Sequence, residues 1–451
     1  MNHKLKSFTI SMCLSLGFMP MFGQQMEELK QGFLNPTKSA QPRVWWHWMN
    51  GNITKDGIRK DLLWMNKTGI AGFHVFDAGL ETPQIVEKRL VYMTPEWKEA
   101  FHYAIKTADS LGMEMTIASS PGWSETGGPW VKDEDGMKKL VWRQMDVVGG
   151  KKLKVKLPEG FTLPGQCQDF HCVPAGTVAS SLDMKSFYRD TYVLAMRLPE
   201  ADKTMFDLNP VVTSSGGTVS LEHLANDSLN DFDTLTVDAN GKTWVDFDFG
   251  KEQTIKSFTW TAVNKAGSYT SFTAHLLSSS DGKVFKEIQD FGYQGSMLRT
   301  QNLKKPVTAR YFRVLLTPND KKAQECLVSM LRLEPVNRVH FACDKAGFGT
   351  YRYGFLAQSP TKAPIEEVVK LADVIDVTSF VKDGVLEWNA PQGRWRILRL
   401  GYALTGKTNH PASPEATGLE VDKLDPVAIR SYFKNYLATM ENSFVVHVFN
   451  G

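Results

Sequence analysis

Three polar and aromatic stretches of the chain carry residue types that could bind and cleave a sugar. Each stretch follows a short apolar run, and together they contain the side chains Trp48, Asn50, Asn52, Asp77, Trp123, Glu125 and Trp130. Carboxylates and amides pair well with vicinal hydroxyl groups, and an aromatic face packs against the C–H face of a sugar ring. Two carboxyl groups also supply the acid and the base of glycoside hydrolysis. The three stretches therefore predict a carbohydrate site.

Each of these residues also has a structural interpretation. Asp77 could cap a helix or form an Asx turn, and Glu125 could form a hydrogen bond within its own loop. His47 and His74 lie within strand-like runs, where a core histidine is the more common outcome, and most of the 12 tryptophans are expected to fill the core. The functional interpretation rests on the combination of tryptophan-rich polar loops that follow strands.

The elements that would position these loops alternate between strand and helix in the first third of the chain. Apolar β-prone runs predict strands over residues 44–48, 72–77 and 113–118. Helices are predicted over residues 54–68 and 95–111. Thr54 and Thr94 are their expected caps, and Pro95 fits the first turn of the second helix. This order predicts a parallel sheet with right-handed crossovers, whose loops would meet at its carboxyl edge.

After Gly149 the pattern changes to short β-prone segments separated by Gly, Pro, Asn and Asp, which is typical of an all-β region. Further strands are predicted at residues 152–157, 192–198, 218–221, 244–249, 385–388 and 394–400. Residues 206–336 are interpreted as a β-sandwich, with a tight turn at Ser280-Asp281-Gly282. A last helix is predicted over residues 426–440.

Composition and charge exclude several classes of protein. The 451 residues are 42% apolar and 22% charged, which excludes wholesale disorder and a collagen-like chain. A net charge of +3 gives no indication of a nucleic-acid partner. Residues 1–24 have a basic start and an interrupted apolar run, which predicts an export signal rather than a membrane-spanning helix. The mature chain would then be secreted or periplasmic, and would keep Cys167, Cys172, Cys326 and Cys343, of which the first two could pair locally.

Several long motifs resemble glycoside hydrolase family 106, the α-L-rhamnosidases of Bacteroidota. They are WWHWMNGN at 45–52, GFHVFDA at 72–78, VEKRLVYMTPEW at 86–97, SPGWSETGGPW at 120–130, GYALTGKTNHP at 401–411 and EATGLEVDKL at 415–424. The intervening region has its own resemblance, to discoidin or galactose-binding-like jelly rolls. That resemblance rests on WVDFDFG at 244–250, SSSDGKVF at 278–285 and ARYFRV at 309–314.

The resemblance implies a fold, an activity and further site residues. The implied fold is α/β plus β: a partial (β/α)₈ TIM-like barrel with an inserted β-sandwich of the jelly-roll type. The implied activity is inverting hydrolysis of terminal α-L-rhamnose from plant-type polysaccharide, with a calcium ion near the sugar whose ligands are not assigned. Glu420 is the candidate acid–base group, with a salt bridge to Lys423 as its structural alternative. His410 and Asp422 are further candidates for binding the sugar, and Asp422 also for binding calcium.

The predicted organisation has six parts. They are a signal peptide (1–24), the first part of the barrel (40–140), a β linker region (141–205), the sandwich (206–336), a second β linker region (337–398) and a continuation of the barrel (399–451). The α/β-patterned parts fall well short of the roughly 250 residues of a full barrel. We therefore expect an N-terminal fragment of a longer enzyme that lacks the second catalytic carboxylate. The alternatives are a non-catalytic glycan-binding protein and an inactive truncated product.

Overall fold

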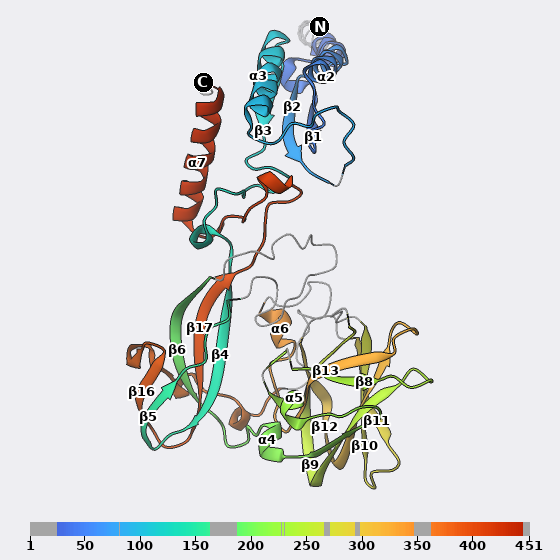
Figure 1. The fold of residues 1–451 in the computed structure, drawn as a ribbon, viewed down its shortest axis with the longest axis vertical. Helices are drawn as coiled ribbons and strands as arrows, with labels where there is room; N and C mark the ends of the chain where they lie inside the picture. The colour runs from blue at the N-terminus through green and yellow to red at the C-terminus, as the bar shows by residue number, and fades with distance from the viewer. Residues whose placement is uncertain are drawn as a thin grey trace, which may run out of the picture. The chain divides into compact units, whose positions relative to one another are not determined.

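The computed structural model describes residues 25–80, 82–162, 187–226, 228–229, 231–265, 271–293, 298–346 and 362–444. The chain is mostly β with few helices and divides into two compact units (Figure 1). The α/β unit comprises Met1–Gly136 and Thr408–Gly451, and the β unit comprises Met137–Lys407. The predicted export segment lies outside the described residues.

The α/β unit is built on a parallel sheet of three strands in the order β1-β2-β3. Its elements are η1 (Lys38–Ala40), β1 (Arg43–Met49), α2 (Lys55–Lys67), β2 (Gly72–Ala78), α3 (Pro95–Ser110), β3 (Glu114–Ile117), η2 (Asp133–Asp135), η6 (Pro414–Ala416) and α7 (Pro426–Phe444). The predicted strands and helices of this region are confirmed. The described part of the unit is an open sheet and shows no helical barrel pattern.

Local chemistry explains where the first two helices begin. The Thr54 hydroxyl accepts a hydrogen bond from the Gly57 amide (3.0 Å), and the Thr94 hydroxyl accepts one from the Trp97 amide (3.4 Å). Each hydroxyl satisfies an amide that has no partner within the helix, as an N-cap does. Pro95 occupies the first turn of α3, where no amide hydrogen is needed. The caps therefore fix both helix starts at the positions that the sequence predicts.

The core of the α/β unit lies between its sheet and its helices. Alternate residues of β1 point to this side, so that Trp46 and Trp48 pack with α2 and α3. The helices contribute Ile58, Leu62, Met65, Trp97, Ala100, Phe101, Ala104 and Ala108, and α7 adds Ala428, Tyr432, Tyr436 and Met440. Residues more than 300 positions apart in the chain thus share one core, which ties α7 to the sheet.

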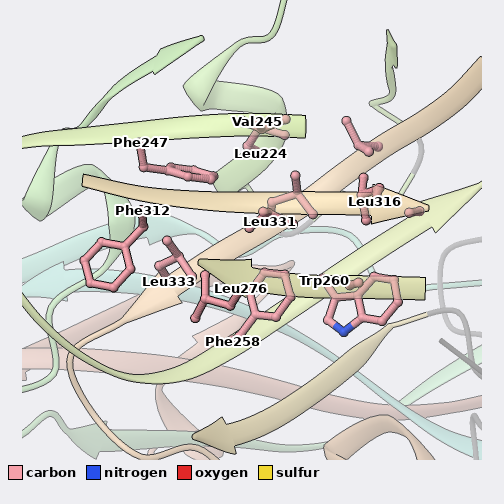
Figure 2. Close-up of a cluster of buried hydrophobic side chains, with 14 of the residues drawn as sticks. Leu224, Val245, Phe247, Phe258, Trp260, Leu276, Phe312, Leu316, Leu331 and Leu333 are labelled. Carbon is pink, nitrogen blue, oxygen red and sulfur yellow. The ribbon is translucent and has the colours of Figure 1, made fainter. Parts of the chain in front are cut away.

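The larger part of the β unit is an antiparallel sheet of seven strands. Their order is β11-β10-β12-β9-β13-β8, with β7 paired to β9. The elements are α4 (Met205–Leu208), β7 (Val211–Ser214), α5 (Leu221–Ala225), β8 (Asp233–Thr236), β9 (Thr243–Val263), β10 (Phe272–Ser279), β11 (Lys286–Tyr293), β12 (Arg299–Pro318), β13 (Glu325–Glu334) and α6 (Ala342–Lys345). Figure 2 shows the core between these strands, in which Phe258, Trp260 and Phe312 are fully buried.

Strand β9 follows the predicted alternation. Val245 and Phe247 point into the core, whereas Asp246 and Asp248 point away and form two-pronged ion pairs with Arg313 and Arg310. The predicted turn at Asp281 is also present, because its carboxylate accepts from the amides of the two residues after Gly282. The strand predicted over residues 218–221 is wrong. There the Ser220 hydroxyl accepts from the Glu222 amide and starts α5, since a serine at this position caps a helix.

The rest of the β unit pairs strands that precede the seven-stranded sheet in the sequence with strands that follow it. Its elements are β4 (Lys138–Val148), β5 (Lys151–Lys156), β6 (Tyr188–Arg197), η3 (Ile365–Glu367), η4 (Leu371–Asp373), β14 (Val374–Asp376), η5 (Thr378–Phe380), β15 (Val381–Lys382), β16 (Val385–Ala390) and β17 (Arg394–Leu404). One sheet has the order β14-β6-β17-β4 and the other β15-β16-β5. Leu153, Trp388 and Trp395 share their core.

Two further expectations concern membranes and cysteines. No helix among the described residues has both the length and the apolar character needed to cross a bilayer. Cys167 and Cys172 lie outside the described residues. Cys326 is a buried thiol in the core of the seven-stranded sheet, and burial raises its pKa well above the ordinary value.

Candidate functional site

Two loops of the α/β unit hold each other in place beyond the carboxyl ends of the parallel strands. Residues 118–130 follow β3 and residues 408–422 precede α7, and we refer to them as the loop pair. The Asn409 side chain is 1% exposed and donates to the Pro121 carbonyl (3.0 Å). The Trp123 amide donates to the His410 carbonyl (3.0 Å), and the Gly128 amide donates to the Leu419 carbonyl (3.2 Å). These bonds bring together segments separated by nearly 300 residues.

Glycine permits this close approach of the loops. A Cβ on Gly418 would lie 2.1 Å from the carbonyl atoms of Gly128, and one on Gly122 would lie 2.8 Å from His410. Gly122 also has a φ of 84°, which a residue with a side chain rarely adopts. The close approach of the two backbones therefore explains why glycine stands at positions 122 and 418.

Two tyrosines of α7 anchor the start of the first loop. The Tyr436 hydroxyl donates to the Ala118 carbonyl (2.8 Å), and the Tyr432 hydroxyl donates to the Ser119 carbonyl (2.5 Å). Burial raises the pKa of Tyr436 to about 12 and also raises that of Tyr432. Both phenols therefore keep their protons at neutral pH and remain hydrogen-bond donors.

Asp77 ends β2 as a buried carboxyl group. Its side chain is 8% exposed, and its Oδ2 accepts a hydrogen bond from the Trp97 indole (2.8 Å). Burial raises the pKa of Asp77 to about 7; Glu415 raises it as well, while the Trp97 bond and Arg89 lower it. A carboxyl group with a pKa near neutrality can donate or accept a proton, as an acid–base group does.

An ion pair lies close to Asp77. Arg89 contacts Glu415 at 2.7 Å, with both side chains about one-quarter exposed, and also donates to the Asn50 side chain (3.3 Å). Arg89 and Glu415 are not among the predicted site residues, although both lie within motifs that carry the family resemblance. The two residues are 326 positions apart, so no local sequence pattern predicts that they form an ion pair in the fold.

Glu420 is held by two neighbours. Ser124 donates to its Oε1 (3.0 Å) and itself accepts from the His410 amide (3.0 Å), while the Lys423 ammonium group contacts Oε2. The Glu420 side chain is 18% exposed. The salt bridge that the structural alternative predicts is therefore present, and it coexists with a serine that fixes the carboxylate within the loop pair.

Trp123 is the exposed aromatic residue of the loop pair. Its side chain is 50% exposed, and its indole nitrogen donates to Nε2 of His47 (2.9 Å). Trp48 is different: it is fully buried and packs edge-on against Trp97 and Phe101 in the core. This burial argues against the ligand-stacking role that the sequence predicts for Trp48, because no ring face is presented to solvent.

The remaining candidates lie in the same unit but differ in their surroundings. Asn52 holds its own loop, because its amide donates to the Pro83 carbonyl and accepts from the Ile85 amide. Trp130 is partly buried against Tyr436. The other three are placed as follows: Glu125 and His410 are exposed, and Asp422 accepts from the Leu424 amide.

The described residues do not assemble a metal site from acidic, histidine and cysteine side chains. Within ranges 25–80, 82–162 and the rest of the described chain, no group of three or more such residues could hold an ion. No step of the chemistry is assigned to the calcium ion that the resemblance implies.

The sequence pattern of glycoside hydrolase family 106, described as alpha-L-rhamnosidase, matches residues 34–448. The chain belongs to this family. A solved rhamnosidase from Novosphingobium sp. PP1Y is similar to it at 40% identity with a TM-score of 0.78, over 92% of this chain and 38% of that one. A Formosa agariphila protein provisionally named as a beta-glucuronidase is 25% identical over 426 residues, or 93% of this chain and 23% of that protein. The chain thus spans less than two-fifths of either relative.

Proposed function

We propose that this chain carries part of the sugar site of a glycoside hydrolase that removes terminal α-L-rhamnose from plant-type polysaccharide. The observation that supports this most is the position of Glu420, which two loops matched to the rhamnosidase family hold through Ser124. An exposed indole on one of these loops and a buried carboxyl group at the end of β2 add groups that suit sugar binding.

In the proposed mechanism the reaction inverts the anomeric centre. One carboxylic acid protonates the glycosidic oxygen while a second carboxylate activates water on the opposite face, the two lying roughly 6.5–9.5 Å apart. Glu420 is assigned to one of these two roles. Asp77, whose pKa burial raises, is assigned to a sugar hydroxyl, and Trp123 to the C–H face of the ring.

The proposal extends to the larger architecture and location. The three parallel strands would belong to a (β/α)₈ barrel, and the seven-stranded sheet would be an inserted jelly roll. An exported protein, secreted or periplasmic in a Bacteroidota-like cell, would meet such polysaccharides. A calcium requirement stays a prediction: sugar release in the assay below should be faster with added calcium than with a chelator, and equal rates would contradict it.

Release of 4-nitrophenol from its α-L-rhamnoside tests the activity of the full chain. Glu420→Gln keeps the size of the side chain and should lower the rate by at least 100-fold, because an acid–base group contributes about that much or more. The matched control is Glu99→Gln, the same change at an exposed glutamate of α3, which should retain the wild-type rate. Proton NMR should show β-L-rhamnose as the first product. An active Glu420→Gln variant would contradict the assignment.

A second candidate function is sugar binding without cleavage. The contact of Lys423 with Glu420 Oε2 favours it, because an ion-paired carboxylate is a poorer partner for a glycosidic oxygen. Binding of rhamnose-capped oligosaccharides without any release of sugar would support this candidate over hydrolysis.

A further inference from the structure

We infer that His47 is a positioning residue that holds the Trp123 indole as a stacking surface for the terminal sugar. The inference rests on the proposed function and deepens it, because it names how one wall of that site is kept in place. His47 lies on β1 and Trp123 lies on the loop after β3, so the contact spans the width of the sheet.

The contact fixes the chemical state of the imidazole. The indole nitrogen can only donate, so Nε2 of His47 must accept, and the ring proton then sits on Nδ1. Burial lowers the pKa of His47, which favours this neutral form. The imidazole is in turn stacked on Phe76, with ring centres 5.3 Å apart and planes at 21°. Since Phe76 is only 8% exposed, the acceptor is held by the sheet itself.

Trp123 is also fixed from its backbone side. Its amide donates to the His410 carbonyl, and the residue before it is Gly122, whose positive φ brings the loop against His410. The residue is thus held at both its main chain and its indole edge, yet half of its surface faces solvent. Exposing a large aromatic ring and restricting its rotation both cost free energy in the unbound protein. A rigid, exposed ring nevertheless suits the binding of an apolar sugar face, because the ring is already held in one orientation before the sugar binds.

The alternative is that the contact only stabilises the loop. Two features favour the binding role. Half of the Trp123 side chain stays exposed although its indole nitrogen is satisfied, and the neighbouring loop residues Ser124 and Glu420 form the polar contact assigned to the reaction. Trp123 is thus adjacent in sequence to Ser124, which holds the Glu420 carboxylate. A site for a half-polar ligand requires such an aromatic surface beside a polar group.

The test compares four variants of the full chain: Trp123→Leu, Trp123→Phe, His47→Leu and His47→Gln. Binding of methyl α-L-rhamnoside is measured by calorimetry, and KM and kcat are measured with the 4-nitrophenyl α-L-rhamnoside. Loss of the ring in Trp123→Leu should raise Kd and KM roughly tenfold with little change in kcat, because stacking acts on bound sugar before and during reaction. His47→Leu should weaken binding in the same direction, and His47→Gln should restore it, since glutamine supplies an acceptor and leucine does not. Trp123→Phe keeps a ring but no donor, and should resemble His47→Leu.

The outcomes separate this inference from the proposed function. Equal binding by wild type and Trp123→Leu overturns the stacking role, and equal losses in His47→Gln and His47→Leu overturn the positioning role. Sugar binding that depends on Trp123, without release of rhamnose, supports the inference while contradicting the proposed hydrolysis. Release with an unchanged KM in Trp123→Leu does the reverse. If His47→Leu does not fold, the comparison of Trp123→Phe with Trp123→Leu still decides the role of the ring.

Discussion

Replacing Asp77 by asparagine should make the α/β unit more stable at alkaline pH. Asp77 ionises near its ordinary pKa of 3.8 in the unfolded chain and at about 7 in the fold, because burial opposes its charge. Between these values the folded state holds a proton that the unfolded state releases, so the free energy of unfolding falls as the pH rises. The difference between the folded and unfolded pKa values of Asp77 corresponds to about 4 kcal/mol of unfolding free energy, because one pKa unit is worth about 1.4 kcal/mol. Asparagine does not titrate, and its carbonyl oxygen can still accept from Trp97.

The expected result is a pH-dependent difference between variant and wild type. Between pH 4 and pH 8 the free energy of unfolding of the variant should rise by up to about 4 kcal/mol relative to that of wild type. Most of this change should be complete by pH 7. Urea unfolding at each pH, with pulsed hydrogen exchange on β2 peptides, isolates the unit that holds Asp77. Asp56→Asn is the sign control, because Lys60 and Arg59 lower the pKa of that exposed carboxylate and its loss should destabilise the protein near neutral pH. A stability difference for Asp77→Asn that stays constant from pH 4 to pH 8 would refute the reasoning.

Three further substitutions test the packing that supports the site. Gly418→Ala should destabilise the α/β unit by about 1–3 kcal/mol, because its Cβ would lie 2.1 Å from Gly128; urea unfolding measures this, and an unchanged midpoint would contradict the close approach. Tyr432→Phe should cost about 1–2 kcal/mol and speed amide exchange in residues 118–130, since the loop loses a hydrogen bond; equal exchange rates would argue against the anchor. Phe258→Ala should cost about 3–5 kcal/mol in the β unit, where the ring is fully buried in the core that Figure 2 shows, and a loss below 1 kcal/mol would be inconsistent with that burial.

Local signals in the sequence were enough to predict most elements of the α/β unit. Thr54 and Thr94 are caps, Pro95 marks a first turn, and apolar periodicity reveals the buried face of α2, all of which act within a few residues. The same local reasoning failed at residues 218–221, where β-prone side chains suggested a strand. Ser220 decides that segment by capping α5, which shows how one hydrogen bond can outweigh a weak strand preference.

The candidate site could be predicted only in outline. Carboxylates and aromatic rings near strand ends indicated loops at the carboxyl edge of the sheet, but they did not reveal which side chains are buried. Trp48 lies within β1 and Trp123 in the loop after β3, and strand alternation turns Trp48 toward the helices, so that it is fully buried whereas Trp123 is half exposed. The Arg89–Glu415 pair, the Ser124–Glu420 bond and the His47 contact join distant segments, so no local pattern could indicate them.

The most direct test of the sugar site is a titration of tryptophan-labelled protein with methyl α-L-rhamnoside, observed by ¹⁵N NMR. The indole signal of Trp123, assigned from the Trp123→Phe variant, should shift and saturate with added sugar, whereas that of Trp260, buried in the seven-stranded sheet, should stay in place. An unmoved Trp123 signal under conditions where the sugar shifts other signals would show that the loop pair is not where this family member binds rhamnose.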